Sequence, residues 1–369
     1  MRKRKSHYSI TFDYSMNLNN PYCGISKDVN SMISMLKDRF LINKYNLSTT
    51  FKAGNFLPNA IDANSNSLNY TLNKIYSLLG FKLHLNPLDS KLFFCFSPNN
   101  YSLPNKVIKI IRLHDLIPIT HPNLTPFFST LLLKNNLRYN AREKNTLFIC
   151  NSNQSKKELL FYYPNLSDRV FILPCHIEMQ SPNILSQNYS LLIAALEPKK
   201  NIYNFLLGWR NYVLNNNSAY SLYIIGNKGW KNSKVSQLIS SLKKLFPEKI
   251  KTLNKLSDSE VSHYISNCKY LVSPSIREGF GLPQVEAIMK KKSILTSNIG
   301  IFHETNKKCA TTFNPFSVND ICEKIKIMES KENYKKSNKD IHTVANKIRQ
   351  HTAITTKKFL EWIEQQSSG

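Results

Sequence analysis

Short apolar runs alternate with longer stretches of helical spacing along almost the whole chain, and this alternation limits the fold more than any other feature. Strands that alternate with helices form parallel sheets joined by crossover helices, so we expect an α/β protein. The predicted strands of the first half are Ser9–Phe12, Leu92–Phe96, Val107–Leu113, Leu147–Cys150 and Val170–Leu173, and those of the second half are Leu191–Leu196, Ser221–Ile225, Leu271–Ser273 and Ile294–Thr296.

The length predicts two domains, because 369 residues exceed the size at which one hydrophobic core stops growing. A polar stretch between Pro174 and Tyr189 separates the two groups of strands. We expect a Rossmann-like domain over residues 1–178, a linker over 179–188, a second Rossmann-like domain over 189–345 and a C-terminal helix over 346–369. The apolar spacing of that last helix indicates packing rather than a ligand site.

Hydropathy and cysteine content predict a cytoplasmic protein. No apolar run approaches the roughly 18 residues that span a bilayer, and the basic segment Met1–Lys5 precedes polar-interrupted sequence rather than a signal-peptide core. The seven cysteines include no Cys-x-x-Cys pair, which favours buried, reduced thiols over a disulfide framework or a zinc site.

The formal net charge of +26 bears on the partners of the protein. Part of it belongs to a solvated surface in a lysine- and asparagine-rich chain. A strongly basic surface also attracts anionic lipid headgroups, so peripheral contact with an anionic inner membrane is a second interpretation. No zinc finger, RNA-recognition signature or repeated aromatic and basic pattern favours nucleic acid.

The segment from Ser273 to Ala287 carries the clearest chemical signal. An apolar strand ends at Ser273, and Pro283 fits the first turn of a following helix, so the residues between form a loop from a strand end to a helix start. Amides near Gly281 at such a start could hold a phosphate. Glu278 would lie in the loop, and Glu286 would point from the first helical turn. The alternative is a solvated Glu278 and a Glu286 that only complements the helix dipole.

This segment resembles the E-x7-E motif of family 4 retaining glycosyltransferases, which have the GT-B fold. Further matches occur in family order at His114–Pro118, Leu196–Asn201 and Ile225–Trp230. The resemblance implies two Rossmann-like parallel-sheet domains facing a central cleft, with the acceptor bound by the first and the nucleotide-sugar donor by the second. It also implies a C-terminal helix that crosses back to the first domain.

The resemblance also implies roles for single residues. Glu278 would orient sugar hydroxyls, Glu286 would hold the ribose, and Lys200 would stabilise the departing diphosphate, which itself helps to deprotonate the acceptor. A histidine at a strand end is most often structural, but the resemblance implies that His114 contacts the transferred sugar. The catalytic candidates are His114, Glu278 and Lys200, and the donor-binding candidates are Gly24, Lys200, Leu256, Phe280, Gly281, Leu282 and Glu286.

The sequence departs from the family pattern at three places. Ala194 and Ala195 stand where the family often has an arginine, so that Lys228 or Arg277 would have to supply the second cation. Asn254 replaces the usual glycine in the segment from Thr252 to Ser257, which we expect to be a loop, and the resemblance implies that the backbone near Leu256 in this loop contacts the base. The family also commonly ends the helix after the second glutamate with a glycine and a proline, whereas this chain has the sequence Met289-Lys290-Lys291-Lys292-Ser293.

We expect no bound metal and no cofactor. The nearest approach to an Asp-x-Asp metal motif is Asp258-Ser259-Glu260, and with Ser257 it fits a capping box at a helix start instead.

These observations predict a retaining, metal-independent hexosyl transfer to a bacterial cell-surface glycan or a polyprenyl-diphosphate-linked acceptor. Mannose from GDP-mannose is the favoured donor, because the motifs look like those of O-antigen and lipopolysaccharide mannosyltransferases, and a UDP-hexose is the nearest alternative. A GT-B-like sugar-nucleotide epimerase and a non-enzymatic basic envelope-binding protein are the rival functions.

Overall fold

The chain forms two compact units in the computed structural model, and each is described by itself. Unit 1 comprises residues 1–176 and 353–369, and unit 2 comprises residues 177–352. The structure describes residues 9–14, 24–45, 83–85, 90–177, 187–216, 219–330 and 340–368. Most of the predicted linker lies outside these described residues.

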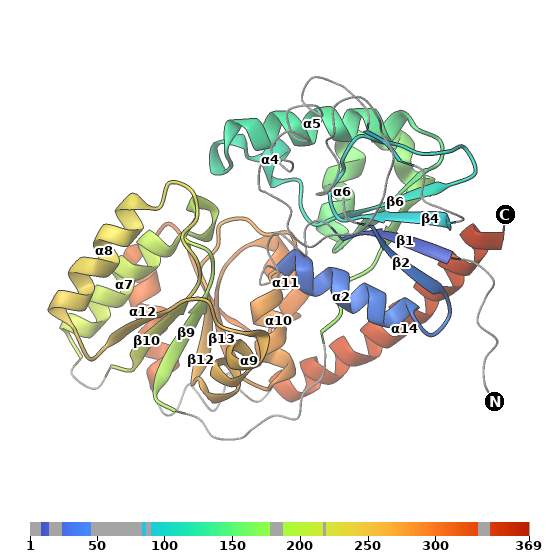
Figure 1. The fold of residues 1–369 in the computed structure, drawn as a ribbon. Helices are drawn as coiled ribbons and strands as arrows, with labels where there is room; N and C mark the ends of the chain where they lie inside the picture. The colour runs from blue at the N-terminus through green and yellow to red at the C-terminus, as the bar shows by residue number, and fades with distance from the viewer. Residues whose placement is uncertain are drawn as a thin grey trace. The chain divides into compact units, whose positions relative to one another are not determined.

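Unit 1 contains a parallel sheet of six strands in the order β2-β1-β4-β6-β7-β8 (Figure 1). These strands are β1 (Ser9–Asp13), β2 (Leu41–Tyr45), β4 (Ser90–Cys95), β6 (Ile108–Leu113), β7 (Thr146–Cys150) and β8 (Val170–Ile172). A second, two-stranded sheet pairs β3 (Leu83–His84) with β5 (Tyr101–Ser102).

Alternate residues of the unit 1 strands pack against helices on the two faces of the sheet. The helical segments are α2 (Gly24–Leu36), α4 (Ile117–Thr120), α5 (Phe127–Arg142), α6 (Asn153–Tyr162), the 3-10 turns η2 (Pro122–Leu124) and η3 (Pro164–Arg169), and the end of α14 (Ile341–Ser368). Phe12 of β1 packs with α2 and with Phe359 of α14 on one face. Phe93 of β4 packs with Leu137 of α5 and Leu159 of α6 on the other.

Unit 2 contains a second parallel sheet of six strands in the order β11-β10-β9-β12-β13-β14. These strands are β9 (Tyr189–Ile193), β10 (Ser221–Ile225), β11 (Ile250–Leu253), β12 (Tyr270–Ser273), β13 (Ser293–Ser297) and β14 (Thr311–Phe313). Strand β9 pairs with β10 on one side and with β12 on the other. The strand order therefore reverses between β9 and β12.

Helices also cover both faces of the unit 2 sheet. The helical segments are η4 (Pro198–Lys200), α7 (Ile202–Leu214), α8 (Ser233–Leu245), α9 (Asp258–Asn267), α10 (Leu282–Met289), α11 (Gly300–Asn306), α12 (Val318–Glu329) and the start of α14. The buried Trp209 of α7 packs with Ile321 of α12 on one face. Ile265 of α9, Ile288 of α10 and Ile341 of α14 pack on the other.

The C-terminal helix α14 contributes to both cores. Ile341 at its start is buried in unit 2, whereas Phe359 and Ile363 near its end are buried in unit 1. Arg39 of unit 1 also forms an ion pair with Glu364 at 2.6 Å. The packing expected from the apolar spacing of this helix is confirmed.

The predicted fold class is confirmed, with two parallel sheets and helices on both faces of each. Every predicted strand is present, with ends that differ by a few residues. One interpretation is wrong: the segment from Thr252 to Ser257 was expected to be a loop, but Thr252 and Leu253 complete the edge strand β11. Among the described residues, no helix combines the length and the apolar character needed to cross a bilayer.

Candidate functional site

The candidate site of unit 2 lies where two loops leave the carboxyl edge of the sheet. The loop after β9 carries Lys200 in η4, and the loop after β12 carries Glu278. Strands β9 and β12 are neighbours, and the strand order reverses between them. Open α/β sheets bind ligands outside the carboxyl ends of their strands at such a switch point.

Lys200 and Glu278 form a direct ion pair in which the ammonium group donates to the carboxylate. The hydroxyl of the buried Ser275 donates to the same carboxylate at 2.8 Å. The two loops are also joined through the backbone, since the N–H of Ile276 donates to the carbonyl of Lys199 at 2.9 Å. The sequence predicted Lys200 and Glu278, but it gave no role to Ser275.

The neighbours of Glu278 decide its charge. Burial raises the pKa of this carboxyl, but Lys200, Lys199 and the hydroxyl of Ser275 together outweigh burial and lower the pKa below its ordinary value. Glu278 is therefore ionised at neutral pH, and it balances the charge of Lys200 inside the loop pair.

The start of α10 depends on Gly281. This residue has a φ of +81°, in the left-handed region that favours glycine, and precedes the first helical residue Leu282. A Cβ on Gly281 would lie 2.8 Å from Nε2 of Gln284 and 2.8 Å from a ring carbon of Phe302. Pro283 stands in the first turn, as predicted. Gly281 therefore brings the first N–H groups of α10 next to the Glu278 loop.

Glu286 does not lie in the first turn of α10, which corrects the expectation. The helix begins at Leu282, so Glu286 is its fifth residue and lies in the second turn. Its charge acts on Lys290, one turn further on, where burial lowers the pKa of the ammonium and Glu286 opposes that change. The helix then ends without a glycine, because Lys291 itself adopts a φ of +59°.

Glycines bring the loops after β9 and β10 together at the same edge. A Cβ on Gly226 would lie 1.9 Å from the carbonyl oxygen of Ala194, and Leu196 forms an isolated parallel bridge with Lys228. In the orientation that satisfies its amide, Asn254 donates to the carbonyl of Gly226 at 2.6 Å. Leu256 lies three residues after the end of β11 at Leu253 and is half-buried against the core of unit 2.

The remaining residues to be placed in unit 2 are Phe280 and the two candidates for the second cation, Lys228 and Arg277. Phe280 is half-buried and packs against the same core cluster as α10. Lys228 is exposed and Arg277 is half-buried, and neither belongs to the ion pair of Lys200. The second cation expected from the family pattern stays a prediction.

Unit 1 places His114 in a buried polar group that the sequence did not predict. His114 follows β6, and its Nε2 lies 3.9 Å from Oδ2 of Asp28. Arg112 binds Asp28 through two hydrogen bonds of 2.7 and 3.1 Å, and it donates to the carbonyl of Leu173 at 2.5 Å. The amide of Asn151 lies 3.4 Å from Nδ1 of His114. A hydrogen bond there leaves the proton of the neutral ring on Nε2.

Charges and burial in this group act in opposite directions. Burial lowers the pKa of His114, and the positive charge of Arg112 lowers it further. The negative charge of Asp28 acts in the other direction but does not outweigh burial. The ring is therefore neutral at pH 7. Burial raises the pKa of Asp28, but Arg112 and then His114 outweigh it and lower the pKa below 3.8. Arg112 within an apolar strand was the one available signal, because a buried guanidinium requires a carboxylate partner.

Two smaller features concern unit 1. Asp115 organises the loop after β6, since its Oδ1 accepts from the N–H of Ile117 at 3.1 Å. Gly24 is the first residue of α2, and no atom lies within 4 Å of the position of a Cβ there. His114 and Gly24 thus belong to unit 1, and the other predicted site residues belong to unit 2.

The predicted capping box is confirmed. Ser257 accepts from the N–H of Glu260 at 3.3 Å, and Glu260 accepts from the N–H of Ser257 at 2.7 Å. In the parts of the chain that the structure describes, no three His, Cys, Asp or Glu side chains cluster in a way that could hold a metal ion. Metal independence stays a prediction.

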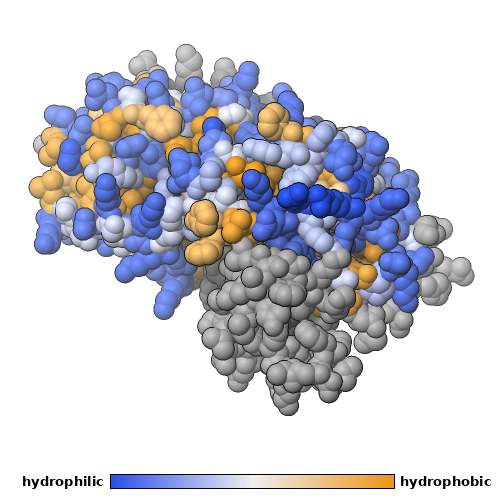
Figure 2. Space-filling view, turned by 90° about the horizontal axis from the view of Figure 1, so that it is seen from above, coloured by the Kyte–Doolittle hydropathy of each residue, from blue (hydrophilic) through white to orange (hydrophobic). Residues whose placement is uncertain are grey.

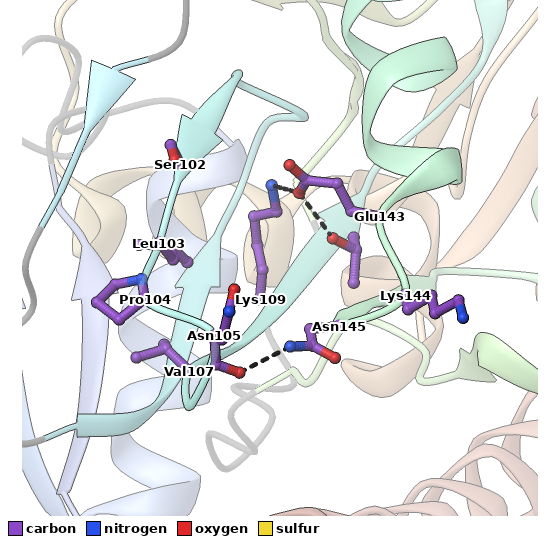
Figure 3. A pocket seen from close by; sticks show the side chains of 10 residues that line it. Ser102, Leu103, Pro104, Asn105, Val107, Lys109, Glu143, Lys144 and Asn145 are labelled. Atoms are coloured by element: carbon purple, nitrogen blue, oxygen red, sulfur yellow. Dashed lines mark hydrogen bonds and ion pairs between the residues drawn. The ribbon is translucent and has the colours of Figure 1, made fainter.

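A cavity of about 400 Å³ lies at the opposite, amino edge of the unit 1 sheet (Figure 3). The residues that line it lie before or at the start of β6 and β7. The buried Lys109 points across the cavity to Glu143 and forms an ion pair with it. Asn145 donates to the carbonyl of Asn105 at 2.8 Å on its other side. The cavity contains none of the predicted site residues.

Residues 176–347 match the family model described as Glycosyl transferases group 1. The chain carries a group 1 glycosyltransferase domain. This glycosyltransferase domain includes Lys200, Glu278 and Glu286, so the resemblance stated for the Glu278 segment is confirmed.

Two curated relatives resemble the chain over a length that exceeds its glycosyltransferase domain. It is 25% identical over 250 residues to the O-antigen chain mannosyltransferase B of Escherichia coli, a match that covers 63% of this chain and 64% of the relative. It is also 25% identical over 220 residues to the O-antigen chain mannosyltransferase RfbU of Salmonella typhimurium, covering 58% of this chain and 59% of the relative. The chain thus matches less than two thirds of the length of each.

A solved structure supports the fold of most of the chain. The structure of WaaG, a glycosyltransferase involved in lipopolysaccharide biosynthesis, aligns with a TM-score of 0.63 at 16% identity and covers 91% of this chain and 95% of WaaG. This likeness and the two parallel sheets together confirm the GT-B fold, of which the glycosyltransferase domain is one part.

Proposed function

We propose that the protein transfers a hexose from a nucleotide sugar to a glycan or a lipid-linked acceptor. The observation that carries this proposal is the ion pair between Lys200 and Glu278 at the switch point of the unit 2 sheet, in the loops that lead into α7 and α10. A nucleotide sugar combines a diphosphate, which is stabilised by cations and N–H donors, with hydroxyls that a carboxylate accepts. The loop pair offers both kinds of group.

Each residue then has one task. Lys200 and the first N–H groups of α10 stabilise the negative charge that develops on the leaving diphosphate, because the helix start and the ammonium both supply positive charge there. Glu278 accepts hydrogen bonds from sugar hydroxyls, and Ser275 holds its carboxylate. Glu286 binds the ribose. Leu256 and Phe280 line the donor site.

Unit 2 is the donor domain in this proposal, and unit 1 binds the acceptor. His114 contacts the transferred sugar, with Asp28 and Asn151 fixing its neutral ring. Gly24 allows close approach of the backbone to a phosphate or to the acceptor. The transfer retains the anomeric configuration and needs no metal, and the diphosphate helps to deprotonate the acceptor hydroxyl.

Mannose from GDP-mannose is the proposed donor, and a bacterial cell-surface glycan is the proposed acceptor. The names of the two relatives, both O-antigen chain mannosyltransferases, support this choice. The reaction takes place in the cytoplasm, with the protein in peripheral contact with the inner membrane.

The test measures binding and slow hydrolysis of a panel of GDP- and UDP-sugars by the purified protein. We expect GDP-mannose to bind and to release GDP slowly. A preference for a UDP-hexose would correct the donor, and a changed sugar formed without acceptor would indicate an epimerase. Binding of no nucleotide sugar would contradict the proposal.

Metal independence has a separate test. Excess chelator should leave the release of GDP unchanged. A loss of release that magnesium or manganese restores would contradict this part of the proposal.

A further inference from the structure

Helix α5 exposes large hydrophobic side chains at its start. Phe127 is 74% exposed and Phe128 is 70% exposed, and Leu131 one turn later is also exposed. The two phenyl rings contact each other edge to face, with centroids 5.8 Å apart. Figure 2 looks down on the side of unit 1 that α5 occupies at the top of Figure 1, and hydrophobic side chains reach that surface among hydrophilic ones.

The same face of α5 becomes cationic towards its end. Lys134, Arg138 and Arg142 are exposed, and they follow Phe127 and Leu131 at helical spacings of three and four residues. The 16 residues of α5 include no Asp or Glu. We name the six residues Phe127, Phe128, Leu131, Lys134, Arg138 and Arg142 the α5 stripe.

Packing holds this stripe outward. The opposite face of α5 is buried through Asn136, Leu137, Asn140 and Ala141. The amide of Asn140 donates to the carbonyl of Asn136 at 2.7 Å and to that of Pro98 at 3.3 Å, so the inner face is tied to the loop after β4. Rotation of α5 that hid the stripe would expose these buried groups.

The end of α6 carries a second exposed aromatic pair. Phe161 is 80% exposed, and its ring contacts that of Tyr162 edge to face at 5.2 Å. Burial raises the pKa of the next residue, Tyr163, and Arg138 of α5 opposes that rise. Tyr163, the residue after α6, therefore lies within electrostatic range of Arg138.

A bilayer surface has the chemistry that this face requires. Aromatic and aliphatic side chains partition into the boundary between headgroups and acyl chains, while neighbouring Lys and Arg side chains attract anionic headgroups. A protein partner with an acidic, apolar groove is the competing occupant. The net charge of +26 favours the membrane, because every anionic bilayer attracts the chain before the stripe makes contact.

We propose that unit 1 docks on an anionic lipid bilayer through the α5 stripe, with Phe127, Phe128 and Leu131 in the interface and Lys134, Arg138 and Arg142 against the headgroups. This inference gives the membrane contact of the proposed function a definite surface. Its test needs no donor and no turnover, so its failure is distinct from failure of the glycosyl transfer.

The experiment measures co-sedimentation of the full chain with vesicles of phosphatidylglycerol and phosphatidylcholine, and with phosphatidylcholine alone. We expect binding to the anionic vesicles only. Phe127→Ser with Phe128→Ser, and separately Lys134→Glu with Arg138→Glu, should each weaken the partition by about tenfold or more. These side chains are exposed, so the melting temperature should not change.

Matched variants in unit 2 control for general charge and hydrophobicity. Phe316→Ser replaces a phenylalanine that is 71% exposed, and Lys244→Glu reverses an exposed lysine of α8. Both should bind anionic vesicles like the unaltered protein. The proposal is overturned if the unaltered protein ignores the anionic vesicles, if the stripe variants bind as well as it does, or if the controls lose as much binding.

Discussion

At the scale of single residues, the ion pair between Lys200 and Glu278 sets the electrostatics of the proposed donor site. A diphosphate would compete with the Glu278 carboxylate for the same ammonium group, because both are anions that accept its hydrogen bonds. Hydrogen bonds from the hydroxyls of a bound sugar to the Glu278 carboxylate would offset the loss of its interaction with Lys200. A nucleoside diphosphate without the sugar has no such compensation, so the pair favours the complete donor over the product.

Replacement of Glu278 by Gln separates these two effects. Glu278→Gln removes the competing charge, so a nucleoside diphosphate should bind about tenfold more tightly, while transfer should be slower by about tenfold or more because hydrogen bonds to a charged acceptor are lost. Calorimetric titration and the rate of nucleotide release measure the two quantities. Glu260→Gln, in the capping box of α9, should change neither. Equal diphosphate affinity in Glu278→Gln and the unaltered protein would contradict this account.

The buried His114 predicts a pH dependence of stability. Because burial lowers its pKa from 6.5, the unfolded chain takes up a proton at a pH where the folded ring is still neutral. The free energy of unfolding should therefore fall as the pH drops below about 6.5, and His114→Asn should reduce this slope in urea melts. His342→Asn, at an exposed position of α14, is the control. If His114→Asn left the pH dependence of the free energy of unfolding unchanged, the lowered pKa of His114 would not be its cause. Asp28 titrates at much lower pH, since its pKa lies below 3.8.

The sequence predicted residues that follow strand ends better than residues that meet across the fold. Lys200 and Glu278 each follow a strand of one parallel sheet, and such strand ends share one edge, so their proximity could be inferred. Asp28 and Arg112 are 84 positions apart, and only the packing of α2 on β6 brings them together. The family pattern gave no role to either residue.

At the scale of elements, the loop into α10 requires backbone geometry that only glycine adopts at low cost. Gly281 combines a φ of +81° with a position where Gln284 and Phe302 leave no room for a Cβ. Gln284 in turn donates to Thr305 of α11 at 2.6 Å, which anchors the first turn. The position of the amides at the start of α10 thus depends on contacts well beyond the Glu278 loop.

Gly281→Ala should distort this helix start. A left-handed backbone costs a non-glycine residue about 1–2 kcal/mol, and the contacts of the new Cβ add to it, so the melting temperature should fall by roughly 2–4 °C or more. Donor binding should weaken as well. Gly24→Ala, where the added Cβ meets no atom within 4 Å, should have the melting temperature of the unaltered protein. Equal melting temperatures for both variants would show that Gly281 is not constrained.

Edge strands account for most of the strands that the sequence did not predict. β2, β11 and β14 each form an edge of a six-stranded sheet. An edge strand has a less continuous apolar run than a central strand, and Leu41 of β2 is even exposed. The central strands β6, β9 and β12, which are buried on both faces, were predicted, and the loops after them carry His114, Lys200 and Glu278.

At the scale of the whole molecule, the stability of unit 1 depends on the C-terminal half of α14. Its end completes the core of unit 1, because Phe359 and Ile363 are fully buried there, and Phe171 stacks on Trp362 with ring centroids 5.1 Å apart. The core of unit 1 is thus incomplete without the C-terminal half of α14. Contacts within unit 1 therefore join distant parts of the sequence, and the ion pair between Arg39 and Glu364 links residues 325 positions apart.

Phe359→Ala should destabilise unit 1 rather than unit 2. Removal of a buried phenylalanine side chain costs about 3–5 kcal/mol, and hydrogen exchange should show the lost protection in β1 and β4 while β9 and β12 keep theirs. Ile354→Ala, which alters an exposed residue of the same helix, should leave both units protected. Equal loss of protection in the two units would contradict this division.

The central claim is that Lys200 and the start of α10 bind the diphosphate of a nucleotide sugar. The most direct measurement is a calorimetric titration of the nucleotide sugar that the unaltered protein hydrolyses, repeated with Lys200→Met and with the surface control Lys244→Met. We predict that Lys200→Met weakens binding by about 10- to 100-fold, because a hydrogen bond to a charged group contributes roughly 1.5–3 kcal/mol, and that Lys244→Met binds like the unaltered protein. Equal affinity of Lys200→Met and the unaltered protein for that donor would contradict the claim.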